Sequence, residues 1–136
     1  MASLTTCIPL YLDADGTEVL SAFLRYDGTE MPFHVCMRVP HNPDTLEFYV
    51  FRDFIAAGLN RTCLPDNCSC QGICLQRDSA GWLQAVFQFP GADPLHSWIL
   101  RQDLENFLVR TYEMTPWGAE FSNYDWDNAR RRLNPE

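Results

Sequence analysis

Short runs that alternate apolar and polar residues, separated by turn residues, constrain the fold of this sequence more than any other feature. In the run that starts at Phe33, the residues Phe33, Val35, Met37 and Val39 point one way, and the residues between them point the other way. The other strand-like runs cover residues 5–12, 18–26, 46–51, 69–75, 82–89 and 95–100. Gly, Asp and Pro fill the short gaps, which favours hairpins. The sequence predicts six or seven strands in an antiparallel sheet.

The run at residues 46–51 differs because both of its faces are largely apolar. Leu46, Phe48 and Val50 share one face, while Tyr49 and Phe51 lie on the other face beside a single glutamate. A strand with this pattern is covered on both sides, or it is covered by a neighbouring subunit.

Three helices are expected. Residues 52–57 form a short helix that Gly58 ends in the left-handed position. Residues 101–114 form the best helix, with one apolar stripe, and residues 115–118 end it. A last helix covers residues 124–133. The whole pattern predicts an α+β fold, with one short central helix and two C-terminal helices, in a single domain over residues 1–136.

The net charge of −8 excludes some classes of partner. An acidic chain repels phosphate backbones and acidic lipids, so nucleic-acid binding is not expected. All ten basic residues are arginine, which indicates a GC-rich genome, and the one basic run, at residues 130–132, reads as a helix end. No apolar run reaches the ~18 residues of a membrane helix, and the N-terminus is unlike a signal peptide. We expect a cytoplasmic protein without membrane insertion.

Four cysteines lie close together at Cys63, Cys68, Cys70 and Cys74. Their spacing is unlike that of zinc knuckles, which pair ligands as C-x2-C. Cysteines also pack well in cores as small apolar side chains, so core packing is the expectation and no structural metal is predicted. A zinc site and disulfides are the alternatives.

His34 and Cys36 share one strand face, with Cβ atoms about 7 Å apart, which is within reach of a water-bridged dyad. No glycine-rich elbow and no orienting carboxylate accompany them, and no phosphate-binding or dinucleotide motif occurs. The sequence therefore predicts no catalytic residues, no cofactor and no enzymatic activity.

Four blocks of the sequence resemble the SsgA-like proteins, which act in sporulation and cell division of actinomycetes. LRYD at residues 24–27, followed by MPFHV at 31–35, is similar to the family's "LRYD…DPYAV". FYVFRDFIAAGL at 48–59 resembles "W-x-F-A-R-D-L-L-x-x-G-L", and LENFLVRT at 104–111 resembles "L-x-x-F-L-x-R-T". TPWGAE at 115–120, with DWD at 125–127, resembles "V-P-P-G-x-E … D-x-D". The blocks keep the family's order and approximate spacing.

The resemblance implies a Whirly-like architecture of crossed antiparallel sheets, like that of single-stranded DNA-binding proteins, assembled as a homotrimer. It also implies a non-enzymatic adaptor at division septa that helps septum placement or assembly and the control of septal or spore-wall peptidoglycan. The implied partners are division proteins, either the tubulin-like FtsZ or another family member. The alternative is a Whirly-like module that binds single-stranded nucleic acid.

The motif residues have two interpretations, partner binding or structural support. An Arg–Asp pair where a strand meets a helix fixes the helix start by charge and hydrogen bonding, or else it contacts a partner. The residues to which this choice applies are Arg25, Asp27, Arg52, Asp53, Trp117 and Gly118.

Overall fold

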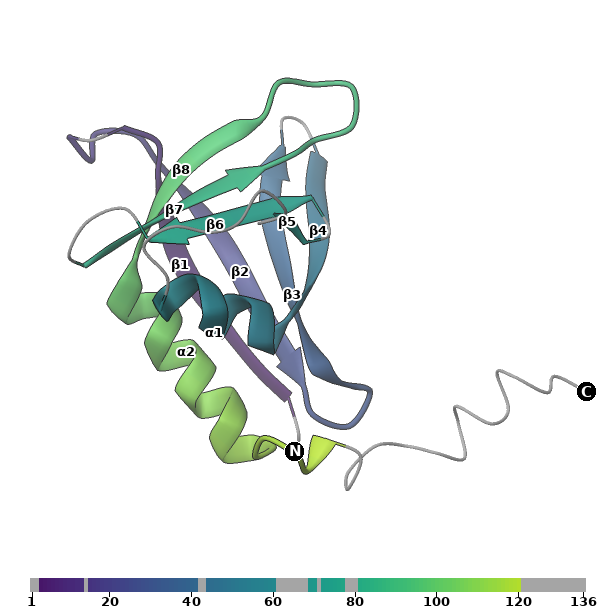
Figure 1. The fold of residues 1–136 in the computed structure, drawn as a ribbon. Helices are drawn as coiled ribbons and strands as arrows, with labels where there is room; N and C mark the ends of the chain where they lie inside the picture. The colour runs from purple at the N-terminus through teal and green to yellow at the C-terminus, as the bar shows by residue number, and fades with distance from the viewer. Residues whose placement is uncertain are drawn as a thin grey trace, which may run out of the picture.

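The computed structural model describes residues 3–13, 15–41, 44–60, 69–70, 72–77 and 81–120. Within these ranges the chain forms eight strands and two helices (Figure 1). In chain order they are β1 (Ser3–Tyr11), β2 (Val19–Asp27), β3 (Met31–His41), β4 (Asp44–Phe51), α1 (Arg52–Asn60), β5 (Ser69–Cys70), β6 (Ile73–Arg77), β7 (Trp82–Phe87), β8 (Leu95–Leu100) and α2 (Arg101–Met114).

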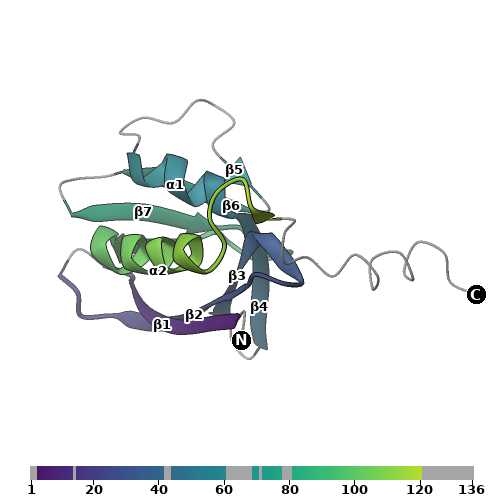
Figure 2. The same ribbon diagram turned by 90° about the horizontal axis from the view of Figure 1, so that it is seen from below.

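The strands form one antiparallel sheet in the order β4-β3-β2-β1-β8-β7-β6-β5. We call β1–β4 the first half of the sheet and β5–β8 the second half. The halves are joined between β1 and β8, where Tyr11 pairs with Trp98. Seen from below, α2 lies between β1 and β2 on one side and β7 and α1 on the other (Figure 2). The fold is therefore α+β, with the helices filling one side of a strongly bent sheet.

The core lies between the inner faces of the two halves. Val35, Met37 and Val39 of β3 are buried, as their alternation predicted. Leu75 of β6 and Ile99 of β8 are fully buried in the same cluster. Burial of these apolar faces is the main favourable contribution to folding, and it commits the alternate side chains of each strand to the outer face.

Carboxylates hold the two predicted turns of the first half. Asp13 accepts hydrogen bonds from the backbone N–H and the hydroxyl of Thr17. Asp27 Oδ1 accepts the backbone N–H groups of Thr29 and Glu30, both at 2.9 Å. These side-chain-to-backbone bonds stabilise tight turns between antiparallel strands.

The expectation that Gly58 ends the central helix is wrong. α1 runs to Asn60, and Gly58 does not have a positive φ. A Cβ atom at Gly58 would lie 3.0 Å from the Cβ of Leu75 on β6. Gly58 therefore lets α1 pack closely on the second half of the sheet, against a segment that is distant in the sequence.

The strand at residues 69–75 also differs from its prediction. Gly72, with φ +85°, makes a tight turn that divides this run into β5 and β6, so the described chain has eight strands and not six or seven. β8 and α2 have the predicted bounds. The predicted helix at 124–133 and the arginines at 130–132 lie outside the described residues.

Cys74 corrects the expectation of core packing for the cysteine cluster. It lies half-buried on β6, between the fully buried Ile73 and Leu75, and it is disulfide-bonded. A disulfide sulfur is not the thiolate that a zinc ion requires. Cys63 and Cys68 lie outside the described residues, and the side chain of Cys70 is also outside the description. Cys7 and Cys36, on the first half, are free.

Candidate interaction surface

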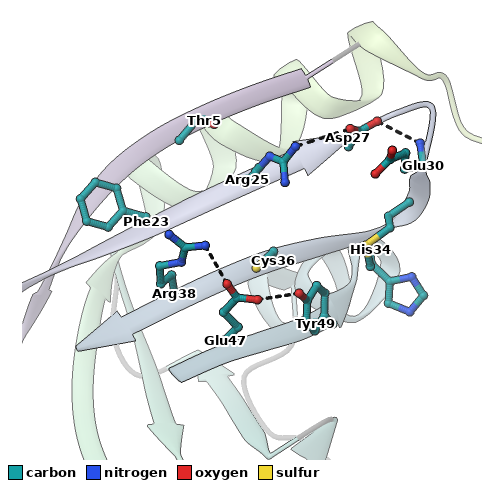
Figure 3. Close-up of a pocket in the computed structure, with 11 residues that line it drawn as sticks. Thr5, Phe23, Arg25, Asp27, Glu30, His34, Cys36, Arg38, Glu47 and Tyr49 are labelled. Atoms are coloured by element: carbon teal, nitrogen blue, oxygen red, sulfur yellow. Dashed lines mark hydrogen bonds and ion pairs between the residues drawn. The ribbon is translucent and has the colours of Figure 1, made fainter. Parts of the chain in front are cut away.

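The first half of the sheet carries a hollow on its outer face (Figure 3). Its volume is about 550 Å³, and we call it the outer hollow. It is lined by Thr5, Phe23, Arg25, Asp27, Glu30, Met31, His34, Cys36, Arg38, Glu47 and Tyr49.

The strand period places these side chains together. The inward residues of β2, β3 and β4 are committed to the core, so their neighbours in sequence face outward. The register aligns Phe23 with Arg38, and Arg38 with Glu47. Two residues along, Arg25, Cys36 and Tyr49 are aligned in the same way. Cross-strand neighbours on one face lie close enough for their side chains to interact.

Glu47 organises one side of the outer hollow. Arg38 Nη2 donates to Glu47 Oε1 at 2.7 Å, and the Tyr49 hydroxyl donates to Glu47 Oε2 at 2.6 Å. The hydrogen bond to Glu47 raises the pKa of Tyr49 to about 12. The same bond, with that from Arg38, lowers the pKa of Glu47. Glu47 is thus ionised at neutral pH and holds both neighbouring side chains in place.

Arg25 is held more loosely on the other side of the outer hollow. Its guanidinium lies 3.7 Å from the carboxylate of Asp27, whose other oxygen fixes the β2–β3 turn. The Arg25 side chain is 58% exposed. An exposed ion pair of this length contributes little to stability, so the cation can turn to another partner.

His34 and Cys36 both line the outer hollow, but their surroundings do not activate them. The ring of His34 packs on Phe51 with 4.2 Å between centroids, and burial lowers its pKa. Burial, together with the charge of Glu47, raises the pKa of the Cys36 thiol. At neutral pH the thiol is protonated, whereas nucleophilic catalysis needs a thiolate. No group of three metal-binding side chains occurs among the described residues.

Large apolar side chains surround this polar network. Phe23 is 48% exposed, and Tyr49 and Phe51 are also exposed. The apolar pattern on both faces of β4 predicted a strand covered on both sides within the chain, or one covered by a neighbouring subunit. Its inner face packs in the core through Phe48 and Val50, but its outer face is open in the single chain. An open patch of aromatic side chains is typical of a contact surface for another molecule.

Arg52 lies inside the molecule and supports its structure. Its side chain is 1% exposed and donates to the carbonyl oxygens of Thr111 (3.1 Å) and Thr115 (2.8 Å) and to the carboxylate of Glu120 (2.8 Å). The guanidinium also lies over the rings of Tyr26 and Tyr112, at 5.1 and 4.2 Å from their centroids. Arg52 thereby joins the start of α1 to the end of α2.

Asp53 takes part in the same connection between the two helices. It lies in the first turn of α1, where a carboxylate is favourable, and accepts a hydrogen bond from the hydroxyl of Tyr112 on α2 at 3.0 Å. Burial and this bond raise the pKa of Tyr112 to about 12.

Trp117 and Gly118 form an exposed turn after α2. Ala119 N–H donates to Pro116 O at 2.9 Å, and Gly118 has φ +90°, which favours glycine. Gly118 N–H donates to Glu120 Oε1 at 2.9 Å, so the turn is attached to the carboxylate that Arg52 holds. Trp117 itself is 73% exposed.

Two solved structures match this chain over nearly its whole length. SsgB, in which mutations correlate to longitudinal cell division during sporulation of Streptomyces coelicolor, matches with a TM-score of 0.65 and 24% identity, over 90% of this chain and 94% of its own. The fold is that of the SsgA-like proteins. An SsgA-like sporulation-specific cell division protein from Thermobifida fusca YX-ER1 matches with a TM-score of 0.70 and 19% identity, over 96% of this chain and 94% of its own.

No protein-family model and no curated protein matches the sequence. The similarity to the SsgA-like structures therefore rests on three-dimensional arrangement and concerns the fold. Neither described helix is long and apolar enough to span a bilayer.

The structure separates the motif residues into two groups. Arg25 and Asp27 line the outer hollow, while Arg52, Asp53, Trp117 and Gly118 lie at the junction of α1 and α2. The candidate residues named from the sequence did not include those that complete these two groups. Glu47 and Tyr49 complete the group in the outer hollow, and Glu120 completes the group at the helix junction. The alternation of residues 46–51 already places Glu47, Tyr49 and Phe51 on one strand face. This shared face is the sequence signal that indicates the outer hollow.

Proposed function

We propose that this chain is a non-enzymatic adaptor of the SsgA-like family that acts in sporulation-specific cell division. The observation that supports this most is the shared fold, which extends over at least nine-tenths of this chain and of both solved structures. The names of those proteins connect the fold with sporulation and cell division. The four sequence blocks in matching order add to the same proposal.

The outer hollow is the proposed contact surface. It combines exposed aromatic rings with arginine and glutamate side chains, the composition typical of protein interfaces. The proposed partners are division proteins, FtsZ or another SsgA-like protein, in the cytoplasm at division septa. Through these contacts the adaptor would help septum placement or assembly and the control of septal or spore-wall peptidoglycan, as part of a homotrimer.

A fluorescent fusion in sporulating hyphae of an actinomycete tests this proposal. We expect regularly spaced bands at the septa, and we expect the band intensity to fall when Tyr49 is replaced by Ser. Val109→Ser is the matched control, because Val109 is exposed on α2 and does not line the outer hollow. Diffuse fluorescence of the folded wild-type fusion throughout sporulation would contradict the proposal.

Binding of single-stranded nucleic acid is a second candidate, because Phe23 and Tyr49 are exposed beside Arg25 and Arg38. Aromatic rings and arginines together can stack on bases. However, each of these arginines is paired with a carboxylate, and the chain carries a net charge of −8. We expect no change in the fluorescence anisotropy of a labelled oligothymidylate, even at low salt. Salt-sensitive binding that Phe23→Ser removes would favour the second candidate.

A further inference from the structure

We propose that Trp117 of one copy of this chain inserts into the outer hollow of a second copy. The inference deepens the proposed function and rests on it, since it takes the outer hollow as a contact surface and names an occupant. The exposed ring of Trp117 and the outer hollow with its aromatic walls both lie outside the core. Each is the proposed binding partner of the other.

The Trp117 turn is built to project its ring. The ring stands at the corner of a turn closed by the Ala119–Pro116 hydrogen bond, and Gly118 adopts a conformation that other residues rarely take. Glu120 accepts the N–H of Gly118 and is itself held by the buried Arg52. A side chain on a backbone fixed in this way loses little conformational freedom when it binds. Tryptophan is also among the residues that most often dominate interface affinity.

The outer hollow offers surfaces that match an indole ring. Phe23 and Tyr49 expose aromatic faces, and Met31 adds a thioether that packs well against rings. The Arg25 guanidinium is available to lie over the indole, an arrangement that favours tryptophan among the aromatic side chains. The volume of about 550 Å³ accommodates the ring together with part of its turn. Because Trp117 is 73% exposed, it does not occupy the outer hollow of its own chain.

Charges beside the ring and the outer hollow are complementary. Glu113 lies on α2, one turn of helix before the Trp117 turn; it is exposed and makes no ion pair with the described part of the chain. Arg25 is the loosely paired cation of the outer hollow. A Glu113–Arg25 pair across the contact adds directional attraction between copies that otherwise repel each other through their net charge.

The ring and the hollow are different surfaces of the same chain, so each copy offers one of each. Two copies can pair them reciprocally about a two-fold axis, or contacts can continue from copy to copy until they close a ring or extend. Either arrangement permits a test that a contact between two identical patches would fail. A chain without the ring and a chain without a working hollow should bind each other once and then stop.

This test uses sedimentation velocity of the purified chain. The salt concentration is about 0.15 M, at which the repulsion between the net charges of the copies is screened. We expect wild type to associate with rising concentration, and Trp117→Ala and Phe23→Ser each to weaken association by about 30-fold. An equimolar mixture of the two variants should form a 1:1 complex and nothing larger. Val109→Ala and Val19→Ser, which remove exposed apolar groups elsewhere, should associate like wild type. Circular dichroism checks that every variant is folded.

Gly118→Ala provides an independent variant, because it strains the turn without touching the ring, and its Cβ would meet open space. Gly81→Ala is its match, with a similar φ of +86° and equally open surroundings. Only the first should weaken association. A monomeric wild type, unchanged association of Trp117→Ala, or a mixture that stays monomeric would each overturn the inference. Septal bands formed by a chain that sediments as a monomer would remove this inference and the homotrimer but leave the proposed septal role standing. Self-association that Trp117→Ala weakens, without septal bands, would do the reverse.

Discussion

Two arginine–carboxylate pairs of nearly equal length lie in opposite surroundings in this molecule. Arg38 and Glu47, 2.7 Å apart, stand on the outer face with side chains 55% and 36% exposed. Arg52 and Glu120, 2.8 Å apart, stand in the interior with side chains 1% and 8% exposed. Water screens the first pair, so it contributes little to stability and serves to arrange the outer hollow. The second pair lacks that screening, and each partner depends on the other to remain buried.

The largest expected effect is that of Arg52→Met. It leaves the Glu120 carboxylate buried without its cation and removes the donor to the carbonyls of Thr111 and Thr115. Losing one partner of a buried pair costs about 3–5 kcal/mol in the free energy of unfolding. Urea denaturation followed by circular dichroism measures the loss. Arg38→Met is the matched control, and it should leave the urea midpoint nearly unchanged.

A second substitution separates the charge from the other contacts of Arg52. Adding Glu120→Leu to Arg52→Met removes the unpaired carboxylate, so the double variant should recover part of the lost stability. The remainder reports the lost hydrogen bonds to the carbonyl groups of Thr111 and Thr115 and the lost stacking on Tyr26 and Tyr112. Equal losses for Arg52→Met and Arg38→Met would remove the distinction between the two pairs.

The pH dependence of stability should be the next largest effect. Burial acts to raise the pKa of Glu120, but its backbone hydrogen bonds and Arg52 outweigh burial, so the pKa is lower than its ordinary value of 4.5. A group with a depressed folded-state pKa stabilises the protein above its unfolded pKa and loses this contribution as the pH falls. The free energy of unfolding should therefore decline as the pH drops below 4.5.

Urea titrations between neutral and acidic pH compare the two glutamates. Glu120→Gln should flatten the acid decline, and Glu47→Gln should flatten it less, because Glu47 is exposed to water although its pKa is also lowered. Asp13, whose pKa is lowered as well, is unchanged in both variants and gives a common background. A larger effect at Glu47 than at Glu120 would contradict the comparison.

The smallest expected effect concerns the outer hollow and is a change in the titration of one tyrosine. Glu47→Gln removes the anionic acceptor of the Tyr49 hydroxyl, so the pKa of Tyr49 should fall from about 12 toward its ordinary value of 10. Alkaline titration of tyrosine absorbance shows this change, with Tyr49→Phe identifying the signal. Tyr112, held at about 12 by burial and by Asp53, should not shift. An unchanged Tyr49 titration would mean that Glu47 does not organise the outer hollow.

The candidate site was partly predictable. The double apolar pattern of β4 indicated an outer face that a single chain leaves open, and the structure has Tyr49 and Phe51 exposed there. The motif residues gave no sign of which arginine is buried, because Arg25 and Arg52 both precede an aspartate closely and read alike in the sequence. The disulfide at Cys74 was only an alternative to the expected core packing, since spacing alone does not determine which sulfur atoms meet.

Local patterns in the sequence were enough to determine the alternation of the strands, the turns at Asp13 and Asp27, and the bounds of β8 and α2, since each depends on residues a few positions apart. Only the tertiary structure decided that Gly58 packs against Leu75 and that Arg52 meets Glu120, 68 residues away. The physical reason is that burial and pairing of a side chain depend on which distant segments close over it. A strand or helix pattern carries no record of those segments.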